Sequence, residues 1–174
     1  MLVTLRTWQK NDRYILAELA NNINIWNNVR DRLPYPYKIQ HAAAFIKFYR
    51  RQKPSQSQAI ELEGRLVGSV GIELQEDIAR ISAELGYWIG EPYWGRGIAT
   101  EAVRKMIGYT FSNFPQIIRL YAKVFDFNTA SMVVLEKNGF HLEAIHRKSA
   151  IKNNTIHDEY LWVRFREDFT RQDP

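Results

Sequence analysis

The stretch EPYWGRGIAT, residues 91–100, has the composition of a binding loop. It places Gly95 and Gly97 on either side of Arg96, between an apolar run and a segment with helical periodicity. Glycine lets the backbone adopt unusual φ/ψ values and approach a bulky ligand closely. The free amides and the dipole at the start of a helix attract anions. The pattern therefore predicts a phosphate or diphosphate site with Thr100 as an added hydroxyl donor, and its alternative is a plain chain turn.

Two common nucleotide motifs do not fit this loop. The Walker pattern ends in Gly-Lys-Ser/Thr, which the stretch lacks. The dinucleotide fingerprint G-x-G-x-x-G requires a third glycine where the chain has Thr100. The acidic residue that this fingerprint places about 20 residues later is missing as well. Both motifs are excluded.

Two carboxylates on predicted strands are candidates for a general base. Glu84 alternates with the apolar Ala83 and Leu85, so it shares the opposite face with Trp88. Glu73, on the preceding strand, also faces away from its apolar neighbours. Nearby aromatic surface can raise the pKa of a carboxylate toward neutrality. The alternative for both residues is a solvated or ion-paired sheet face.

The histidines and the absence of cysteine limit the other chemistries. Of the four scattered histidines, only His157 has a suggestive neighbour, Asp158, and neighbouring strand residues face opposite sides. We find no spacing typical of a metal site and expect no metal. The chain has no cysteine, which excludes disulfides, thiolate zinc sites and thiol catalysis.

Hydrophobic periodicity predicts the elements that position these side chains. Apolar residues at helical spacing predict helices at residues 11–22, within 23–37, and at 41–52, 98–113 and 128–139. Apolar runs bounded by turn residues predict strands at residues 3–8, 58–62, 65–74, 79–90, 117–125, 141–151 and 156–165. Glu63-Gly64 is the predicted hairpin turn between the second and third strands. The order of elements predicts an α+β or α/β domain with a mixed sheet.

Length and composition fit one soluble globular domain over residues 1–174, with 45% hydrophobic and 25% charged residues. The longest apolar run, Ala42–Ile46, is too short for a bilayer, and the N-terminus lacks a signal peptide's apolar stretch. We therefore expect a cytoplasmic protein with no membrane partner. The net charge of +5 can steer an anionic ligand or reflect a solvated surface, with one tight basic cluster at Arg50, Arg51 and Lys53.

The segments WGRGIA, NTASMVVLEKNGF and HDEYLW, in this order and spacing, resemble the GNAT superfamily of N-acetyltransferases. WGRGIA is similar to the family's pyrophosphate loop, Gln/Arg-x-x-Gly-x-Gly/Ala, with Trp94 in place of Gln or Arg. With RTWQKND near the N-terminus, the resemblance covers nearly the full chain. It is greatest for the RimJ/RimL-like branch, the ribosomal-protein N-terminal alanine acetyltransferases. It implies a twisted, mostly antiparallel sheet that is splayed between two parallel strands and flanked by helices.

The resemblance also implies acetyl-CoA as the co-substrate. Its pantetheine arm matches the backbone of the strand before the loop, at Tyr87, Trp88 and Ile89. Its diphosphate matches the loop and the helix start, at Gly95, Arg96, Gly97, Ile98, Ala99 and Thr100. Asn128 matches an asparagine that contacts the pantetheine arm, and a role as helix N-cap is compatible with this contact.

The implied reaction is direct attack of a neutral amine on the thioester within a ternary complex. It needs a base, a donor to the carbonyl and a group that protonates or stabilises the leaving thiolate. Many relatives use a tyrosine for the last task, where this chain has Leu135. Ser131 matches a serine with this role in the ribosomal branch, and the alternative is a small polar residue in a first helical turn. Glu84, and after it Glu73, are the candidate bases.

In this family the early helices cover the acceptor pocket. The resemblance therefore implies that Trp26, Tyr35 and Tyr37 line this pocket, and the alternative is ordinary loop packing. We expect an N-acetyltransferase whose acceptor is a protein or peptide α-amine or a small-molecule amine, with no nucleic acid partner and with homodimerisation left open. The alternative function is a non-catalytic acyl-CoA-binding sensor or a basic nucleic-acid-binding module. A basic stripe interleaved with exposed aromatics, typical of the latter, is lacking.

Overall fold

The computed structural model describes residues 2–172 and divides into two compact units. The first unit comprises Met1–Gly71 and Tyr87–Ala102, and the second comprises Ile72–Gly86 and Val103–Pro174. Strands β3 and β4 and helix α4 each begin in one unit and end in the other. A single domain over residues 1–174 stays a prediction.

The elements of each unit follow the predicted order. The first unit holds β1 (Val3–Arg6), α1 (Asp12–Ala20), α2 (Ile23–Trp26), α3 (Ile39–Tyr49), β2 (Ser57–Leu62), most of β3 (Arg65–Leu74), the end of β4 (Ser82–Ile89), η2 (Glu91–Tyr93) and the start of α4 (Ile98–Asn113). The second unit holds the remainder of β3, β4 and α4 together with η1 (Asp77–Ala79), β5 (Arg119–Phe125), α5 (Thr129–Lys137), β6 (His141–Lys152), β7 (Thr155–Phe165) and α6 (Arg166–Gln172).

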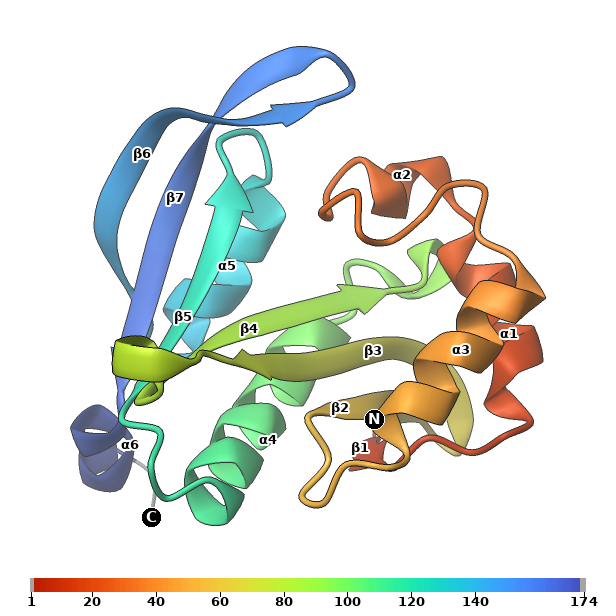
Figure 1. The fold of residues 1–174 in the computed structure, drawn as a ribbon, viewed down its shortest axis with the longest axis horizontal. Helices are drawn as coiled ribbons and strands as arrows, with labels where there is room; N and C mark the ends of the chain where they lie inside the picture. Colours follow the sequence, from red (N-terminus) through yellow and green to blue (C-terminus); the bar gives the residue numbers. More distant parts are fainter. Residues whose placement is uncertain (1, 173–174) are drawn as a thin grey trace. The chain divides into compact units, whose positions relative to one another are not determined.

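The strands form a seven-stranded sheet in the order β1-β2-β3-β4-β5-β7-β6 (Figure 1). The pairs β1–β2, β2–β3, β5–β7 and β6–β7 are antiparallel. Strands β4 and β5 are parallel, because helix α4 connects them and returns the chain to the starting edge. The predicted mixed sheet is confirmed.

The parallel ladder between β4 and β5 is short. It joins Ser82–Glu84 to Arg119–Tyr121 in three residue pairs, although β4 continues to Ile89 and β5 to Phe125. Along β5 the antiparallel ladder with β7 continues to the last residue, Phe125. The parallel pairing is therefore confined to the first halves of both strands.

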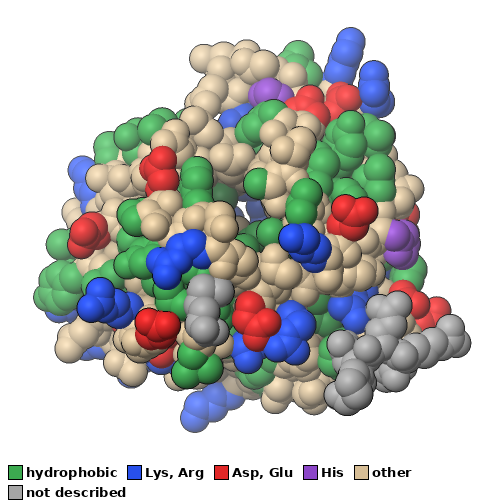
Figure 2. Space-filling view, turned by 180° about the vertical axis from the view of Figure 1, so that it is seen from behind, with side chains coloured by type: hydrophobic (Ala, Val, Ile, Leu, Met, Phe, Trp, Pro, Cys, Tyr) green, Lys and Arg blue, Asp and Glu red, His purple; other side chains and the backbone are tan. Residues whose placement is uncertain are grey.

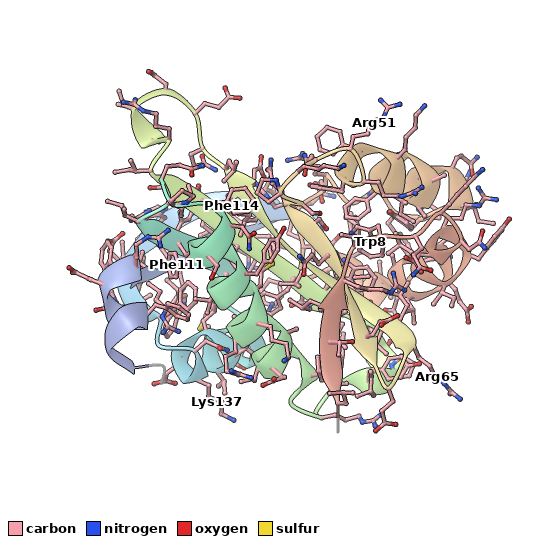
Figure 3. All side chains as sticks on the ribbon, turned by 90° about the horizontal axis from the view of Figure 1, so that it is seen from below. Trp8, Arg51, Arg65, Phe111, Phe114 and Lys137 are labelled. Carbon is pink, nitrogen blue, oxygen red and sulfur yellow. The ribbon has the colours of Figure 1, made fainter. Side chains whose placement is uncertain are left out.

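The core of the first unit is aromatic. The Trp8 ring meets the Phe45 ring edge-on at a centroid distance of 5.5 Å, and its indole N–H donates to the Ser57 hydroxyl at 3.1 Å. Trp8 is 3% exposed and lies between α3 and the strands (Figure 3). Leu16 and Ile46, from α1 and α3, belong to this core together with Tyr37, Leu66 and several alanines.

The core of the second unit forms around α4. The predicted apolar stripe of this helix is buried, with Met106 and Ile107 fully inaccessible. The guanidinium of Arg166 donates to the carbonyls of Phe111, Phe114 and Ile117 at 2.8–2.9 Å and thereby closes the C-terminal end of α4. Figure 3 shows Phe111 and Phe114 at this end of the helix. Arg166 begins α6, an element that the periodicity did not predict.

Several predicted boundaries were wrong. The strand predicted at 3–8 ends at Arg6, and the strand predicted at 117–125 begins at Arg119. The strand predicted at 79–90 begins only at Ser82, because the 3₁₀ turn η1 occupies Asp77–Ala79. The helix predicted at 41–52 spans Ile39–Tyr49 instead. The hairpin at Glu63-Gly64 is confirmed, with both residues at positive φ. Within the described part of the chain, no helix is long and apolar enough to cross a membrane.

Candidate functional site

The loop after β4 has the backbone geometry that its sequence predicts. Gly95 has a φ of +72° and Gly97 a φ of +73°, in the left-handed region that other residues rarely adopt. A Cβ atom added at either glycine would meet no atom within 4 Å. The backbone conformation, rather than crowding, therefore requires glycine here. Gly95, Arg96 and Gly97 are all exposed, so a ligand can reach their backbone.

Helix α4 begins directly after this loop. Ile98 is 1% exposed and anchors the start of the helix, and the Glu101 amide donates to the Gly97 carbonyl at 3.2 Å. The amides of Ile98, Ala99 and Thr100 precede this bond, at the end of the helix that carries partial positive charge. Loop and helix start together have the geometry of an anion site.

The short turn η2 connects β4 to the loop and is held by side chains. The Trp94 indole N–H donates to the Ile89 carbonyl at 2.6 Å, which folds the turn back on the end of β4. The Glu91 carboxylate accepts from the side-chain amides of Asn22 at 2.6 Å and Asn24 at 2.9 Å. The loop is thereby tied to α2. Sequence reasoning missed Glu91, because its partners lie almost 70 residues away.

The backbone of β4 has two different edges near its end. The Gly90 amide donates to the Val67 carbonyl at 2.8 Å, and a Cβ at Gly68 would clash with the Trp88 carbonyl oxygen. Trp88 therefore directs its backbone toward β3. Because strand residues alternate, Tyr87 and Ile89 direct theirs to the opposite edge. Of the three predicted pantetheine contacts, only Tyr87 and Ile89 have backbone groups at this second edge.

The predicted acceptor-pocket aromatics fall into two environments. The Trp26 and Tyr35 rings lie 5.8 Å apart, and Tyr35 is 45% exposed. Tyr37 is 5% exposed and belongs to the core of the first unit, where burial raises its pKa to about 12. The Trp26–Tyr35 pair is accessible to a ligand, whereas Tyr37 packs inside.

In the second unit, α5 starts with the predicted N-cap. The Asn128 side-chain oxygen accepts from the Ser131 amide at 3.1 Å, and the Asn128 amide donates to the Phe125 carbonyl at 2.9 Å. Asn128 and Ser131 are both half-buried. Leu135, one turn further, is fully buried in the core. The N-cap role of Asn128 is confirmed, and its contact with a cofactor stays a prediction.

Glu84 occupies the last position of the parallel ladder. It is paired with Tyr121, and both side chains are half-buried, whereas the preceding pair, Ala83 and Leu120, is fully buried. The predicted alternation of β4 is thus confirmed. Glu73 is also half-buried, near the end of β3. Their assignment as bases stays a prediction.

The structure pairs His157 with Asp126 and not with its sequence neighbour Asp158, which was expected to face the opposite side of the strand. His157 Nδ1 lies 3.0 Å from an Asp126 carboxylate oxygen. Asp158 instead accepts from the Lys148 amide at 2.7 Å and lies 3.3 Å from Arg147. Asp126 follows β5 immediately and precedes Asn128 by two residues. Sequence reasoning missed this pair, because β7 brings His157 back to β5 over 31 residues.

A separate basic groove of about 450 Å³ lies between α1 and α3. It is lined by Lys10, Arg13, Ala43, Ile46, Lys47, Arg50 and Arg51. On the face seen in Figure 2, by contrast, charges of both signs are interspersed. The groove contains none of the residues that the loop chemistry uses. The described residues include no group of three or more side chains suited to a metal ion.

The sequence matches the family described as Acetyltransferase (GNAT) domain over residues 3–141. The chain belongs to this GNAT acetyltransferase family. A probable N-acetyltransferase of Bacillus subtilis, YjcK, is 38% identical over 98 residues, which cover 56% of this chain and 53% of the relative. The ribosomal-protein-serine acetyltransferase of Escherichia coli is 28% identical over 102 residues, covering 59% of this chain and 56% of the relative. The chain spans about half the length of these curated relatives.

Solved structures confirm the predicted GNAT fold. A ribosomal alpha-N-protein acetyltransferase, RimL, in complex with coenzyme A has a TM-score of 0.82 at 20% identity, covering 94% of this chain and 93% of its own. The microcin self-immunity acetyltransferase MccE, in complex with acetyl-CoA and AMP, has a TM-score of 0.80 at 24% identity, covering 94% and 92%. RimJ of Mycobacterium smegmatis, in complex with a CoA disulfide, has a TM-score of 0.83 at 23% identity, covering 95% and 83%.

Proposed function

We propose that the protein is an N-acetyltransferase that transfers the acetyl group of acetyl-CoA to a primary amine. The loop Gly95–Gly97 carries this proposal, because two left-handed glycines lead from a parallel strand into a helix start in a chain of the GNAT family. Relatives with the same fold are described in complex with CoA or acetyl-CoA, which supports the same ligand here.

Acetyl-CoA binding would use both backbone and side chains. The diphosphate is held by the amides from Gly95 to Thr100, with Arg96 and the Thr100 hydroxyl beside it. The pantetheine amides pair with the outward backbone groups of Tyr87 and Ile89, and the Asn128 side-chain amide donates to the arm while its oxygen caps α5. The Ile89 carbonyl already accepts from Trp94, so the Ile89 amide is the better partner.

The reaction is direct attack by the neutral amine on the thioester carbonyl. A C–N bond forms, the C–S bond breaks, and the leaving thiolate is protonated or stabilised by the Ser131 hydroxyl. Glu84 and Glu73 were the sequence's candidate bases. Both lie on half-buried sheet positions, where either carboxylate could accept a proton directly or through water.

The descriptions of similar proteins support a choice among the acceptors. One relative acts on a ribosomal protein serine, and another, an Escherichia coli L-amino acid N-acetyltransferase, is 29% identical over 104 residues. A third protein, the RimL structure with the same fold, is described as an alpha-N-protein acetyltransferase. We therefore place an α-amine of a peptide or an amino acid first among acceptors. The Trp26–Tyr35 pair and the α2 segment tied to Glu91 would lie against it.

An acceptor screen that follows CoA release tests the proposal. It would cover peptides with free N-termini, amino acids, polyamines and amino sugars. We expect release of CoA that depends on the acceptor, and mass spectrometry should show a gain of one acetyl group on that acceptor. Acetyl-CoA binding without release across the whole panel would instead support the non-catalytic sensor.

The basic groove is the observation that favours the nucleic-acid alternative. Its five cations equal the net charge of +5, so the remainder of the chain has a formal charge of zero. Two results would support that alternative: the protein binds single-stranded RNA with an affinity that falls steeply with salt, and the triple variant K47E/R50E/R51E no longer binds it. We expect the triple variant to keep acetyl transfer to a small amine. A cytoplasmic location stays a prediction.

A further inference from the structure

We infer that His157, held by Asp126, is the general base that deprotonates the acceptor amine. The inference rests on the proposed acetyl transfer and supplies the base that the sequence left open between Glu84 and Glu73. The two residues come from β7 and from the loop after β5, and both belong to the second unit.

The pair lies where parallel strands place their ligands. In open α/β sheets, ligands bind outside the carboxyl ends of the parallel strands. Strand β5 is one of the two parallel strands, and Asp126 is the first residue after its carboxyl end. The Asp126 amide donates to the Asp158 carbonyl at 3.1 Å, so this loop is fixed against β7. Asn128, the proposed pantetheine contact, follows two residues later.

The hydrogen bond sets the protonation state that a base requires. The Asp126 carboxylate is an acceptor, so the Nδ1 atom of His157 carries the proton across the 3.0 Å contact. Nε2 is then the basic nitrogen. After Nε2 accepts a proton, the carboxylate stabilises the imidazolium that forms, as the orienting aspartate does in serine hydrolases.

Two aromatic rings hold the imidazole in place. The centroid of the His157 ring lies 4.9 Å from that of Phe127 and 5.9 Å from that of Phe125, and those two phenylalanines stack on each other. The His157 side chain is 18% exposed, whereas the Asp126 side chain is 38% exposed. The histidine therefore stays partly accessible while its orientation is restricted from two sides.

Other charged groups lie on the same face of the sheet as His157. Glu159, two residues after His157 on β7, lies on the same face as His157. The register pairs Glu159 with Phe125 of β5 and with His146 of β6, so His146 shares this face. The Glu159 carboxylate accepts from the Ser149 hydroxyl at 2.9 Å. Lys123 shares this face of β5 and is exposed. The imidazole itself has its hydrogen bond with Asp126.

The proton balance is complete without a further reactant. The acceptor ammonium gives one proton to His157 Nε2, and the resulting amine lone pair attacks the thioester carbonyl. Collapse of the adduct breaks the C–S bond, and the second N–H proton leaves with the thiolate to give the CoA thiol. The imidazolium then releases its proton to solvent.

The test compares His157→Gln and Asp126→Asn with the control His141→Gln, a change at an exposed histidine of the same hairpin. The acceptor is the best substrate of the panel described above, and kcat/KM is measured from pH 5 to 9. We expect His157→Gln to lower kcat/KM by about 10²- to 10⁴-fold and to abolish the acidic limb of the profile. Acetyl-CoA affinity, measured by calorimetry, should stay unchanged, and the control should behave like the wild type.

Asp126→Asn separates a chemical role from a structural one. The asparagine amide can donate to Nδ1 and so favour the tautomer with its proton on Nε2. We expect a rate loss smaller than that of His157→Gln. The ¹⁵N chemical shifts of the imidazole should show that the Nδ1–H tautomer is no longer populated. Wild-type rates and an unchanged pH profile in both variants would overturn the assignment while leaving acetyl transfer intact. A wild-type protein that acetylates no member of the panel would instead overturn the proposed function itself, and the base assignment with it.

Discussion

The segments that follow the two parallel strands differ in how they are built. After β4, the chain presents backbone: two glycines at positive φ and the amides that begin α4. After β5, it presents side chains: Asn128 caps α5, and Asp126 orients His157. Both segments lead from a strand into a helix. One is suited to a spread-out anion, and the other to directed hydrogen bonds and proton transfer.

This difference indicates that backbone groups suffice for binding the anion, whereas proton transfer needs an oriented side chain. A diphosphate offers many oxygens, so backbone amides at fixed positions suffice to hold it. Proton transfer depends on one atom with a suitable tautomer, which only an oriented side chain supplies. Variants in the first segment should therefore change affinity, and variants in the second should change rate.

The largest effect on acetyl-CoA affinity is expected at Gly97. In Gly97→Val, a β-branched residue at a φ of +73° costs about 1–3 kcal/mol of strain or forces the loop to another conformation. We expect acetyl-CoA affinity to fall by at least about 100-fold in calorimetry. Gly64→Val is the matched control, because its φ of +82° lies in the β2–β3 turn. Equal affinity in the wild type and Gly97→Val would remove the loop from the binding site.

A smaller effect, and one on rate, is expected at Ser131. If its hydroxyl assists the leaving thiolate, Ser131→Ala should lower kcat by about 10²-fold with little change in acetyl-CoA affinity. Because the Ser131 amide, not its side chain, bonds to Asn128, the N-cap should persist. Single-turnover kinetics with the best acceptor measure this. Equal turnover in the variant would exclude Ser131 from the mechanism.

The smallest effect should separate the two roles of Asn128. Asn128→Ser keeps an N-cap oxygen but removes the amide donor, so stability should hold while acetyl-CoA affinity falls by about 2- to 10-fold, equivalent to one hydrogen bond. Asn128→Ala removes both groups and should also lower the unfolding free energy by about 0.5–2 kcal/mol. Thermal melts and calorimetry on both variants distinguish these outcomes. An unchanged affinity in Asn128→Ser would leave Asn128 as a cap alone.

Much of the fold could be predicted, because the strongest signals are local. The apolar stripe of α4 gave its bounds of Ile98–Asn113 without error, and the Glu63-Gly64 turn lies where two strong strand patterns meet. Helix α6 was missed because Arg166 stabilises it by reaching three carbonyls of the α4–β5 region. No periodicity within seven residues can report such contacts.

The candidate site divides in the same way. The sequence by itself determined the family, the mixed fold and the glycine loop, because positive φ values and a helix start are encoded by neighbouring residues. Only the tertiary structure decided that Tyr37 is buried, that Glu91 ties the loop to α2 and that His157 is paired with Asp126 rather than Asp158. Each of these depends on residues distant in the chain, and strand register, not sequence proximity, determines which side chains meet.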